Sequence, residues 1–588
     1  MSHYATKALT YWKPIVEETK ISLGEEHPST LTHTHDLALT YQYLGRYNEA
    51  LDLQRPLLEV SKQVMGEEHP ATLSRTNNLA LTYQFLGRYN EALDLQKPLL
   101  EVSKQVMGEE HPDTMTHTNN LAMTYQHLGR YNEALDLQKP LLEVSKQVMG
   151  EEHPDTMTHT NNLAMAYQHL GRYNEALDLQ KPLLEVSKQV MGEEHPATLT
   201  RKNDLALTYQ YLGRYNEALD LQRPLLEVSK QVMGEEHPAT LTRKNDLALT
   251  YQYLGRYNEA LDLQKPLLEV SKQVMGEEHP ATMTRKNDLA LTYQYLGRYN
   301  EALDLQRPLL EVSKQVMGEE HPATLSRKND LALTYQYLGR YNEALDLQRP
   351  LLEVSKQVMG EEHPATLSRT NNLALTYQYL GRYNEALDLQ KPLLEVSKQV
   401  MGEEHPATMT RKNDLALTYQ YLGRYNEALD LQRPLLEVSK QVMGEEHPAT
   451  LSRTNNLALT YQFLGRYNEA LDLQKPLLEV SKQVMGEEHP DTMTHTNNLA
   501  MTYQHLGRYN EALDLQKPLL EVSKNVMGED HPRTLTFRHN LAMIYHDLEE
   551  HETSTQSLKP IVEAPTTFPL SNQTVLHSHK ATKLPKKV

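Results

Sequence analysis

The chain is 588 residues long, carries a net charge of −19 and contains no cysteine, which excludes disulfides and cysteine-ligated metal sites. The negative charge argues against nucleic acid as a partner, because phosphate binding depends on clustered lysine and arginine. The sequence has no run of about 18 apolar residues and no apolar N-terminal stretch, so we expect no membrane partner, no secretory signal and a cytoplasmic location.

Residues 1–26 precede the first His-Pro pair and align with the second half of a repeat, Ala8 with Ala50 and Pro14 with Pro56. We expect an N-terminal half repeat here.

The glycines establish the period: one series starts at Gly24, another at Gly45, and steps of 42 residues account for all 25 glycines. Stacked repeats share one continuous core, so we expect a single elongated array of about thirteen repeats over residues 27–564, with the last repeat degenerate.

Each repeat is predicted to contain two helices, as the repeat that begins at His195 illustrates. Helix A should span roughly 196–212, because Pro196 suits the first turn of a helix and Gly213 suits the left-handed residue that ends one. Its apolar residues recur at helical spacing and define one buried face: Leu199, Leu205, Ala206, Tyr209 and Leu212.

Helix B should begin with Asn216 as its cap, run to Met233 and stop at Gly234. Its apolar residues cover a broad arc, so the helix should lie between neighbours: Ala218, Leu219, Leu221, Leu225, Leu226, Val228, Val232 and Met233. Pro224 falls on the polar side of this helix, where water can satisfy the carbonyl group that proline leaves unbonded. We therefore predict a kink in every helix B and no break.

The repeat pattern decays after Leu548, where Glu549 replaces the glycine and a polar version of helix B follows. Terminal repeats with a solvated outer face have this composition. Residues 565–588 are predicted to be a flexible basic tail, which we interpret as a solubilising end. Its four lysines could instead act as a localisation or acidic-partner signal: Lys580, Lys583, Lys586 and Lys587.

The helix pair also shows a regular alternation of small and large residues, Asn203-x-Leu205-Ala206-x-x-Tyr209 followed by Leu212-Gly213-x-Tyr215-x-x-Ala218. This pattern resembles the tetratricopeptide repeat. The 42-residue period and the Gly-Glu-Glu-His-Pro linker resemble in particular the kinesin light chain type of this repeat. The resemblance implies an all-α fold, a right-handed superhelical solenoid of stacked antiparallel two-helix units.

Three residues depart from that family pattern. These departures affect the expected spacing between the helices and not the expected architecture. Lys202 lies where the family usually has a large apolar residue, Gln222 where it has an aromatic one, and Leu225 where it prefers a small one. A kinesin light chain would also carry a long heptad coiled coil ahead of its repeats. Residues 1–26 do not show one, so the sequence does not support attachment to a motor.

A second face of helix A is the candidate binding site. In the resembled family helix A builds the inner wall of the array, and Thr200, Asn203, Leu207 and Gln210 fall on one stripe with Tyr211 beside it. Carboxamides can bond a peptide backbone while leucine and tyrosine supply apolar contact, so an extended peptide is the expected ligand. Alternatively, these amides form a structural ladder between helices. The predicted peptide-binding residues are Asn203, Leu207, Gln210, Tyr211, Asn245, Gln252, Tyr253, Asn287, Gln294, Tyr295, Asn329, Gln336 and Tyr337.

Variation between the repeats is concentrated in helix A. Five repeats pair a lysine with an aspartate two residues later, as in Lys202 and Asp204, and six others have threonine and asparagine there, as in Thr76 and Asn78. Charges that change together suggest a compensating ion pair across neighbouring helices, because residues two apart do not face each other on a helix. Duplication of whole blocks would produce the same correlation.

Three repeats carry an additional aspartate and two additional histidines, as in Asp113, His117 and His127. Stacked imidazoles could bind zinc, although aspartate and histidine four residues apart are equally a local helix pair. His127 occupies the position in its repeat that Tyr211 occupies in the repeat beginning at His195. A histidine at this position would make the surface there pH-sensitive. We expect no metal and no cofactor, and we interpret the His-Pro histidines as capping or packing residues.

Enzymatic motifs are missing, because every glycine ends a helix and no phosphate-binding loop or His-Glu-x-x-His sequence occurs. We therefore expect no enzyme. The favoured function is a protein–protein interaction scaffold or adaptor that binds extended peptide segments along helix A. The alternative is a structural spacer, or the recognition arm of a larger assembly such as a kinesin light chain-like cargo adaptor or an innate-sensor component. The oligomeric state is left open.

Overall fold

The computed structural model describes residues 2–548, with side chains from residue 7 onward, and this part of the chain contains 26 helices and no strand. The chain divides into two compact units, the N-terminal unit Met1–Gly192 and the C-terminal unit Glu193–Val588. The predicted helix B of the last repeat and the predicted tail lie outside the described residues.

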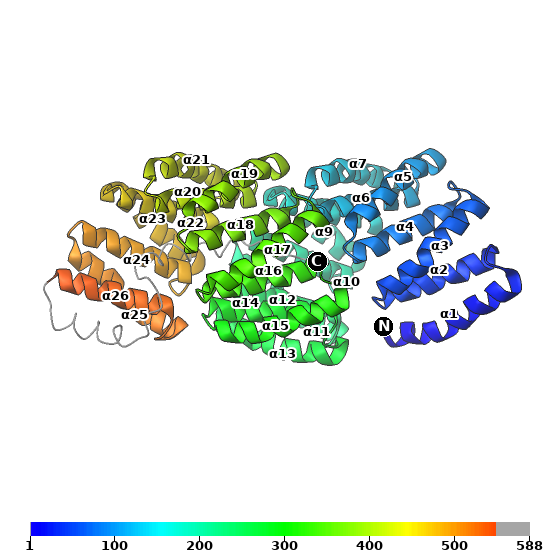
Figure 1. Ribbon diagram of the computed structural model, residues 1–588, viewed down its shortest axis with the longest axis horizontal. Coiled ribbons are helices and arrows are strands. Elements are labelled where there is room, and N and C mark those ends of the chain that lie inside the picture. The colour runs from blue at the N-terminus through cyan, green and yellow to red at the C-terminus, as the bar shows by residue number, and fades with distance from the viewer. Residues whose placement is uncertain (1, 549–588) are drawn as a thin grey trace. The chain divides into compact units, whose positions relative to one another are not determined.

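The N-terminal unit contains nine helices (Figure 1). The first lies where the sequence places the N-terminal half repeat, and helix A (even numbers) and helix B (odd numbers) then alternate. Their bounds are α1 (Ser2–Leu23), α2 (Pro28–Tyr43), α3 (Tyr47–Met65), α4 (Pro70–Phe85), α5 (Tyr89–Met107), α6 (Pro112–His127), α7 (Tyr131–Met149), α8 (Pro154–His169) and α9 (Tyr173–Met191).

The C-terminal unit continues the alternation. Its helices are α10 (Pro196–Tyr211), α11 (Tyr215–Met233), α12 (Pro238–Tyr253), α13 (Tyr257–Met275), α14 (Pro280–Tyr295), α15 (Tyr299–Met317), α16 (Pro322–Tyr337), α17 (Tyr341–Met359), α18 (Pro364–Tyr379), α19 (Tyr383–Met401), α20 (Pro406–Tyr421), α21 (Tyr425–Met443), α22 (Pro448–Phe463), α23 (Tyr467–Met485), α24 (Pro490–His505), α25 (Tyr509–Met527) and α26 (Pro532–Asp547). Within each unit, consecutive helices pack against each other, and each helix A also contacts helix A of the next repeat. The predicted all-α solenoid is confirmed, and its superhelical hand stays a prediction.

Helix A begins and ends as its sequence predicts. In α10 the Nδ1 atom of His195 accepts a hydrogen bond from the backbone N–H of Ala197 at 3.2 Å, and Pro196 occupies the first turn. After the helix, Gly213 has a φ of 70°, the left-handed conformation that glycine adopts without steric cost. Leu205 and the other predicted apolar residues of this helix are buried or half-buried.

Helix B begins earlier than predicted. Arg214 is the N-cap residue of α11 and makes no side-chain capping bond, so the assignment of Asn216 as the cap is wrong. The tight turn explains the difference: the N–H of Arg214 donates back to the carbonyl of Tyr209 at 2.9 Å, while its carbonyl accepts from Ala218 at 3.1 Å. The helical bonding pattern therefore already starts at Arg214.

The buried face of helix B is narrower than predicted and includes polar groups. Ala218 and Leu225 are fully buried, whereas Val232 near the end of α11 is 41% exposed, so its assignment to the buried stripe is wrong. Gln222 and Ser229 are buried instead. The helix passes through Pro224 without a break, as predicted, because this proline lies on the exposed side; the kink stays a prediction.

Candidate functional site

The glutamines of the predicted site bond between repeats. Gln210 Nε2 donates to the carbonyl oxygen of Asp246 at 3.2 Å and to the hydroxyl group of Thr250, both in α12. Thr250 in turn donates to Oε1 of Gln222 in α11 at 2.6 Å. This explains why Gln222 departs from the aromatic residue of the family pattern. The equivalent glutamines of the next three repeats make the same bonds: Gln252, Gln294 and Gln336.

The asparagines form a second ladder between neighbouring helix A elements. Asn203 Nδ2 donates to the carboxylate of Asp246 at 2.8 Å, and Asn245 and Asn287 bond the aspartate of the next repeat at 2.8 and 3.0 Å. Where the next repeat carries asparagine, the direction of the bond reverses, because Asn372 Nδ2 donates to Asn329 Oδ1 at 2.9 Å. The following helix A can therefore carry either aspartate or asparagine at the position that bonds the asparagine of the preceding repeat.

At Asp246 and Asp288 this ladder takes the place of the expected lysine–aspartate pair. In the described part of the chain Asp246 forms no ion pair with a lysine, and neither does Asp288. Their carboxylates bond asparagine instead. Loss of hydration, helped by the neighbouring carboxylates of Asp246 and Asp330, raises the pKa of Asp288 to about 7, although the bond from Asn245 opposes the shift.

Three tyrosines of the predicted site stack on the first tyrosine of the preceding helix B. The rings of Tyr215 and Tyr253 have centroids 5.7 Å apart, and those of Tyr257 and Tyr295 lie 5.5 Å apart. Burial raises the pKa of Tyr295 to about 12. Tyr337 stacks in the same way on Tyr299 at 6.0 Å.

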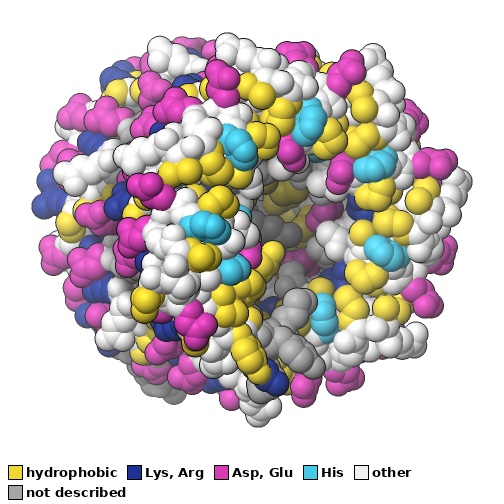
Figure 2. All heavy atoms as spheres, turned by 90° about the vertical axis from the view of Figure 1, so that its right-hand side faces the viewer, with side chains coloured by type: hydrophobic (Ala, Val, Ile, Leu, Met, Phe, Trp, Pro, Cys, Tyr) yellow, Lys and Arg dark blue, Asp and Glu magenta, His cyan; other side chains and the backbone are white. Residues whose placement is uncertain are grey.

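The leucine of the predicted site is buried in some repeats and half-buried in others. Leu207 is buried in α10, whereas Leu249 and Leu291 are half-buried. On the face drawn in Figure 2, hydrophobic and histidine side chains gather together, and acidic side chains are spread around them. Partly exposed apolar groups thus remain available along helix A.

One acceptor in each of three successive repeats lacks a partner. The Oδ1 atoms of Asn203, Asn245 and Asn287 are buried, and they accept no hydrogen bond from the described residues. Buried polar groups are normally paired, and an unpaired one costs about 1–3 kcal/mol. These three acceptors, spaced by one repeat, are the unsatisfied groups of the predicted site.

The histidines of the variant repeats have structural partners. His117 Nδ1 lies 2.8 Å from the hydroxyl oxygen of Ser103, the same kind of contact that Arg75 makes with Ser61 at 2.8 Å. His127 stacks on a tyrosine with centroids 4.9 Å apart, and burial lowers its pKa. Within residues 2–548, no group of three or more histidine, aspartate or glutamate side chains is arranged to hold a metal ion.

The C-terminal unit brings helix ends into contact with distant helix starts, which the sequence did not indicate. His447 Nε2 donates to the carbonyl oxygen of Tyr211 at 3.0 Å, and His489 makes the same bond to Tyr253 at 3.0 Å. The capping role predicted for the His-Pro histidines is confirmed, since His447 Nδ1 accepts from the N–H of Ala449 at 3.0 Å. Each of these rings therefore uses both nitrogens, which requires the neutral form.

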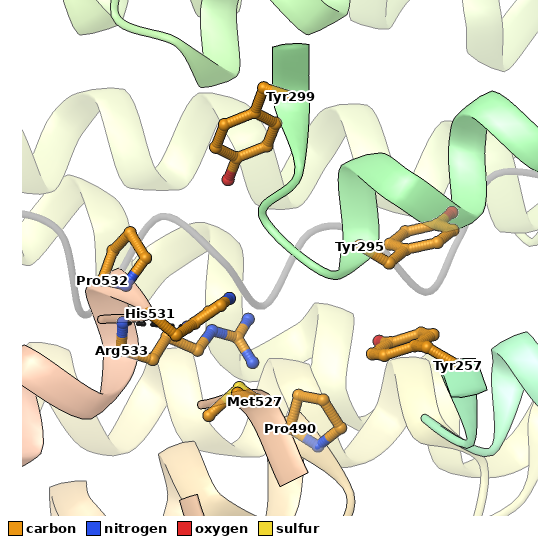
Figure 3. Close-up of a pocket in the computed structure, with 8 residues that line it drawn as sticks. All are labelled: Tyr257, Tyr295, Tyr299, Pro490, Met527, His531, Pro532 and Arg533. Carbon is orange, nitrogen blue, oxygen red and sulfur yellow. Dashed lines mark hydrogen bonds between the residues drawn. The ribbon is translucent and has the colours of Figure 1, made fainter. Parts of the chain in front are cut away.

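A small open pocket lies at the next such contact, between α13–α15 and α24–α26. It measures about 370 Å³ with its mouth included. Figure 3 shows three tyrosines on one side and the guanidinium group of Arg533 pointing toward them from the other. Its lining residues are Tyr257, Tyr295, Tyr299, Pro490, Met527, His531, Pro532 and Arg533.

The family model described as Tetratricopeptide repeat matches the chain in twelve overlapping segments that together run from residue 29 to residue 559. The chain belongs to the tetratricopeptide repeat family. As a member of this family it is a scaffold for protein–protein interaction, and the family is generally non-enzymatic. A search among curated proteins returned no match.

Solved structures similar to this tetratricopeptide array include two described as putative kinesin light chain nearly identical TPR-like repeats from Podosopora anserina, one of them a variant with a single substitution. The variant is 28% identical to this chain with a TM-score of 0.33, and the match covers 35% of this chain and 97% of that one. The other structure is 29% identical with a TM-score of 0.33, and the match covers 35% of this chain and 98% of that one. BtubC (BKLC) from P. vanneervenii is 21% identical with a TM-score of 0.32, and the match covers 40% of this chain and 92% of that one.

None of the helices in the described part of the chain combines the length and the apolar character that a membrane span requires.

Proposed function

We propose that this tetratricopeptide array is an adaptor that binds extended peptide segments of other proteins along α10, α12, α14 and α16. The observation that carries this proposal is the row of unpaired acceptors on Asn203, Asn245 and Asn287, which recurs once per repeat. An extended peptide would supply backbone N–H donors to such a row once these buried side chains turn outward to meet it. Packed helices lie about 10 Å apart and an extended chain advances about 3.3 Å per residue, so roughly three peptide residues would span each repeat.

Apolar contact would come from the leucine beside each acceptor. Leu249 and Leu291 are half-buried and repeat at the same interval as the asparagines. The stacked tyrosines, such as Tyr253 on Tyr215, extend this apolar surface. A peptide with small or apolar side chains at every third position suits this spacing.

A structural spacer is the second candidate, and the hydrogen-bonding ladder favours it. The donor groups of Gln210 and Asn203 are engaged by the next repeat, so these amides hold the array together whether or not a ligand binds. In a spacer, the apolar residues along helix A would have no ligand to contact. Substituting them therefore separates the two functions.

The test is selection from a displayed library of random peptides. The variant carries Leu249→Gln and Leu291→Gln, which removes half-buried apolar surface and leaves the asparagine ladder intact. Its control carries Val232→Gln and Val274→Gln on helix B, where both valines are 41% exposed. Circular dichroism first establishes equal helicity for all three proteins.

The adaptor proposal expects the parent and the control to enrich a common peptide pattern that the leucine variant fails to enrich. If no peptide is enriched by the parent, or if all three proteins enrich the same peptides, the helix A surface does not bind peptides. The spacer function is then the better account of the array.

A further inference from the structure

Every helix A of the array carries the start half of the contact seen in the C-terminal unit, and every helix A except α26 also carries the end half. Each begins with a His-Pro pair whose Nδ1 atom accepts the capping bond, as at His447, so that Nε2 can donate elsewhere. The helices of complete repeats are followed by Leu-Gly-Arg, and the glycine allows close approach. A Cβ atom on Gly255 would lie 2.6 Å from Cδ of Pro490, and one on Gly213 would collide with Pro448.

Ends of helix A lie against distant starts of helix A at three successive positions with constant spacing. The ends of α10, α12 and α14 meet the starts of α22, α24 and α26. His195 and His447 are 252 residues apart, which is six periods of 42, so helix A meets the sixth helix A after it. The contact therefore depends on residues common to all repeats and on no unique side chain.

At other positions of the chain, helix A ends and helix A starts of the same kind are exposed. At the ends of α18, α20 and α22, a Cβ atom on Gly381, Gly423 or Gly465 would meet none of the described residues within 4 Å, and all three glycines are exposed. At the starts of α2 and α4, His27 and His69 are exposed, and the equivalent histidine of α6 is half-exposed.

Charged side chains flank both open surfaces. Glu67 and Glu68 precede the His-Pro start of α4 and are exposed, whereas Arg424 and Arg466 follow the glycines at the ends of α20 and α22. Each of these arginines is paired with one glutamate of its own helix B, as Arg424 is with Glu427 at 2.8 Å. Its remaining N–H groups can still meet a carboxylate of an approaching helix start.

We propose that a second copy of this chain docks on the open ends of α18, α20 and α22 through the starts of its own α2, α4 and α6. This contact between two molecules has the same form as the contact within one molecule, where the ends of α10, α12 and α14 meet the starts of α22, α24 and α26. Because the two surfaces differ, the association is head-to-tail and continues beyond a dimer.

Sedimentation velocity of the full chain over a range of concentrations tests this proposal. A start variant carries His27→Asn, His69→Asn and His111→Asn, because asparagine keeps an N-cap acceptor but lacks the Nε2 donor. An end variant carries an asparagine at each open glycine, because asparagine tolerates the left-handed conformation and its side chain blocks close approach: Gly381→Asn, Gly423→Asn and Gly465→Asn.

A control variant carries Val64→Gln, Val106→Gln and Val148→Gln, which are exposed residues of helix B outside the proposed contact. The parent and this control should sediment faster as concentration rises, while the start variant and the end variant each stay monomeric. An equal mixture of the start and end variants should form dimers that do not grow, because each contributes one intact surface. Monomeric parent protein, variants that assemble like the parent, or a mixture that stays monomeric would each overturn the proposal. Circular dichroism checks that every variant is folded.

Discussion

Asp288 lies between two residues of its own kind, because the repeats before and after it place Asp246 and Asp330 at the same position of helix A. Its carboxylate bonds Asn245, while the Oδ1 atom of that asparagine has no partner among the described residues. The junction between Asn329 and Asn372 avoids both problems, since Asn372 donates to Oδ1 of Asn329 and carries no charge. The residue-level choice between aspartate and asparagine thus affects stability at each junction.

The change Asp288→Asn should stabilise the protein above neutral pH. The folded-state pKa of about 7 lies above the ordinary value of 3.8, so the folded protein holds a proton that the unfolded chain has lost. Stability therefore falls as pH rises from about 4 to about 7, and asparagine removes this loss, by up to about 4 kcal/mol. Urea unfolding at pH 8 and pH 4.5 measures the difference.

The control for this prediction is Asp262→Asn, an exposed aspartate of α13. It should change stability little and equally at both pH values. A stabilisation by Asp288→Asn that is the same at pH 4.5 as at pH 8 would contradict the electrostatic explanation.

At the scale of the element, helix B combines a continuous helix with an internal proline. In α15, Pro308 is exposed and cannot donate to the carbonyl oxygen of Asp304 one turn earlier. The helix nevertheless runs from Tyr299 to Met317, because its other face is buried against the neighbouring helices. Packing therefore outweighs the local cost of proline, which is about 3 kcal/mol in an isolated helix interior.

Replacing this residue, Pro308→Ala, should stabilise the array by about 1–3 kcal/mol, because alanine restores the missing helical hydrogen bond. Guanidinium unfolding of the full chain gives the measurement. Pro322→Ala in the first turn of α16 is the matched control, since the N–H at that position has no helical partner in any case. Equal effects of the two substitutions would show that the helical bond is not the cause.

The helices were the most predictable part of this protein, because proline, glycine and apolar spacing act locally. Pro196 and Gly213 bound helix A where the sequence places them. The partners of Gln222 and Asn203 were not predictable, because they belong to the next repeat and depend on how two helices are aligned. The candidate site was placed on helix A by the resemblance and stays a prediction, while the ladder, already an alternative from the sequence, received its partners only from the hydrogen bonds.

At the scale of the molecule, the contacts between distant repeats of the C-terminal unit should respond to acid. Burial lowers the pKa of His447 to about 4; Arg453 contributes to the shift, and the bond to Tyr211 opposes it. Because the folded-state pKa lies below the unfolded value of about 6.5, the stability from the neutral ring is complete above pH 6.5 and is lost as pH falls toward 4. The thermal unfolding temperature should fall over this interval.

The variant His447→Asn should lower stability at neutral pH and weaken this acid response, because asparagine keeps the cap but loses the bond to Tyr211. His195→Asn is the matched control, since His195 caps α10 and is exposed. Thermal unfolding between pH 7.5 and pH 4 compares the three proteins. An acid response that is identical in the parent and in His447→Asn would exclude this histidine as its source.

The pairing of each helix A with the sixth after it gives the number of repeats a physical meaning. The C-terminal unit contains nine helix A elements among the described residues, α10 to α26, and three such pairs. Recombination between near-identical blocks of the gene adds or removes whole periods, and the pairing survives because every block encodes the same start and end. Arrays of six or fewer helix A elements gain nothing from it, whereas each later duplication adds one further contact. Inherited changes in copy number would thus alter stability in steps and favour long arrays over short ones.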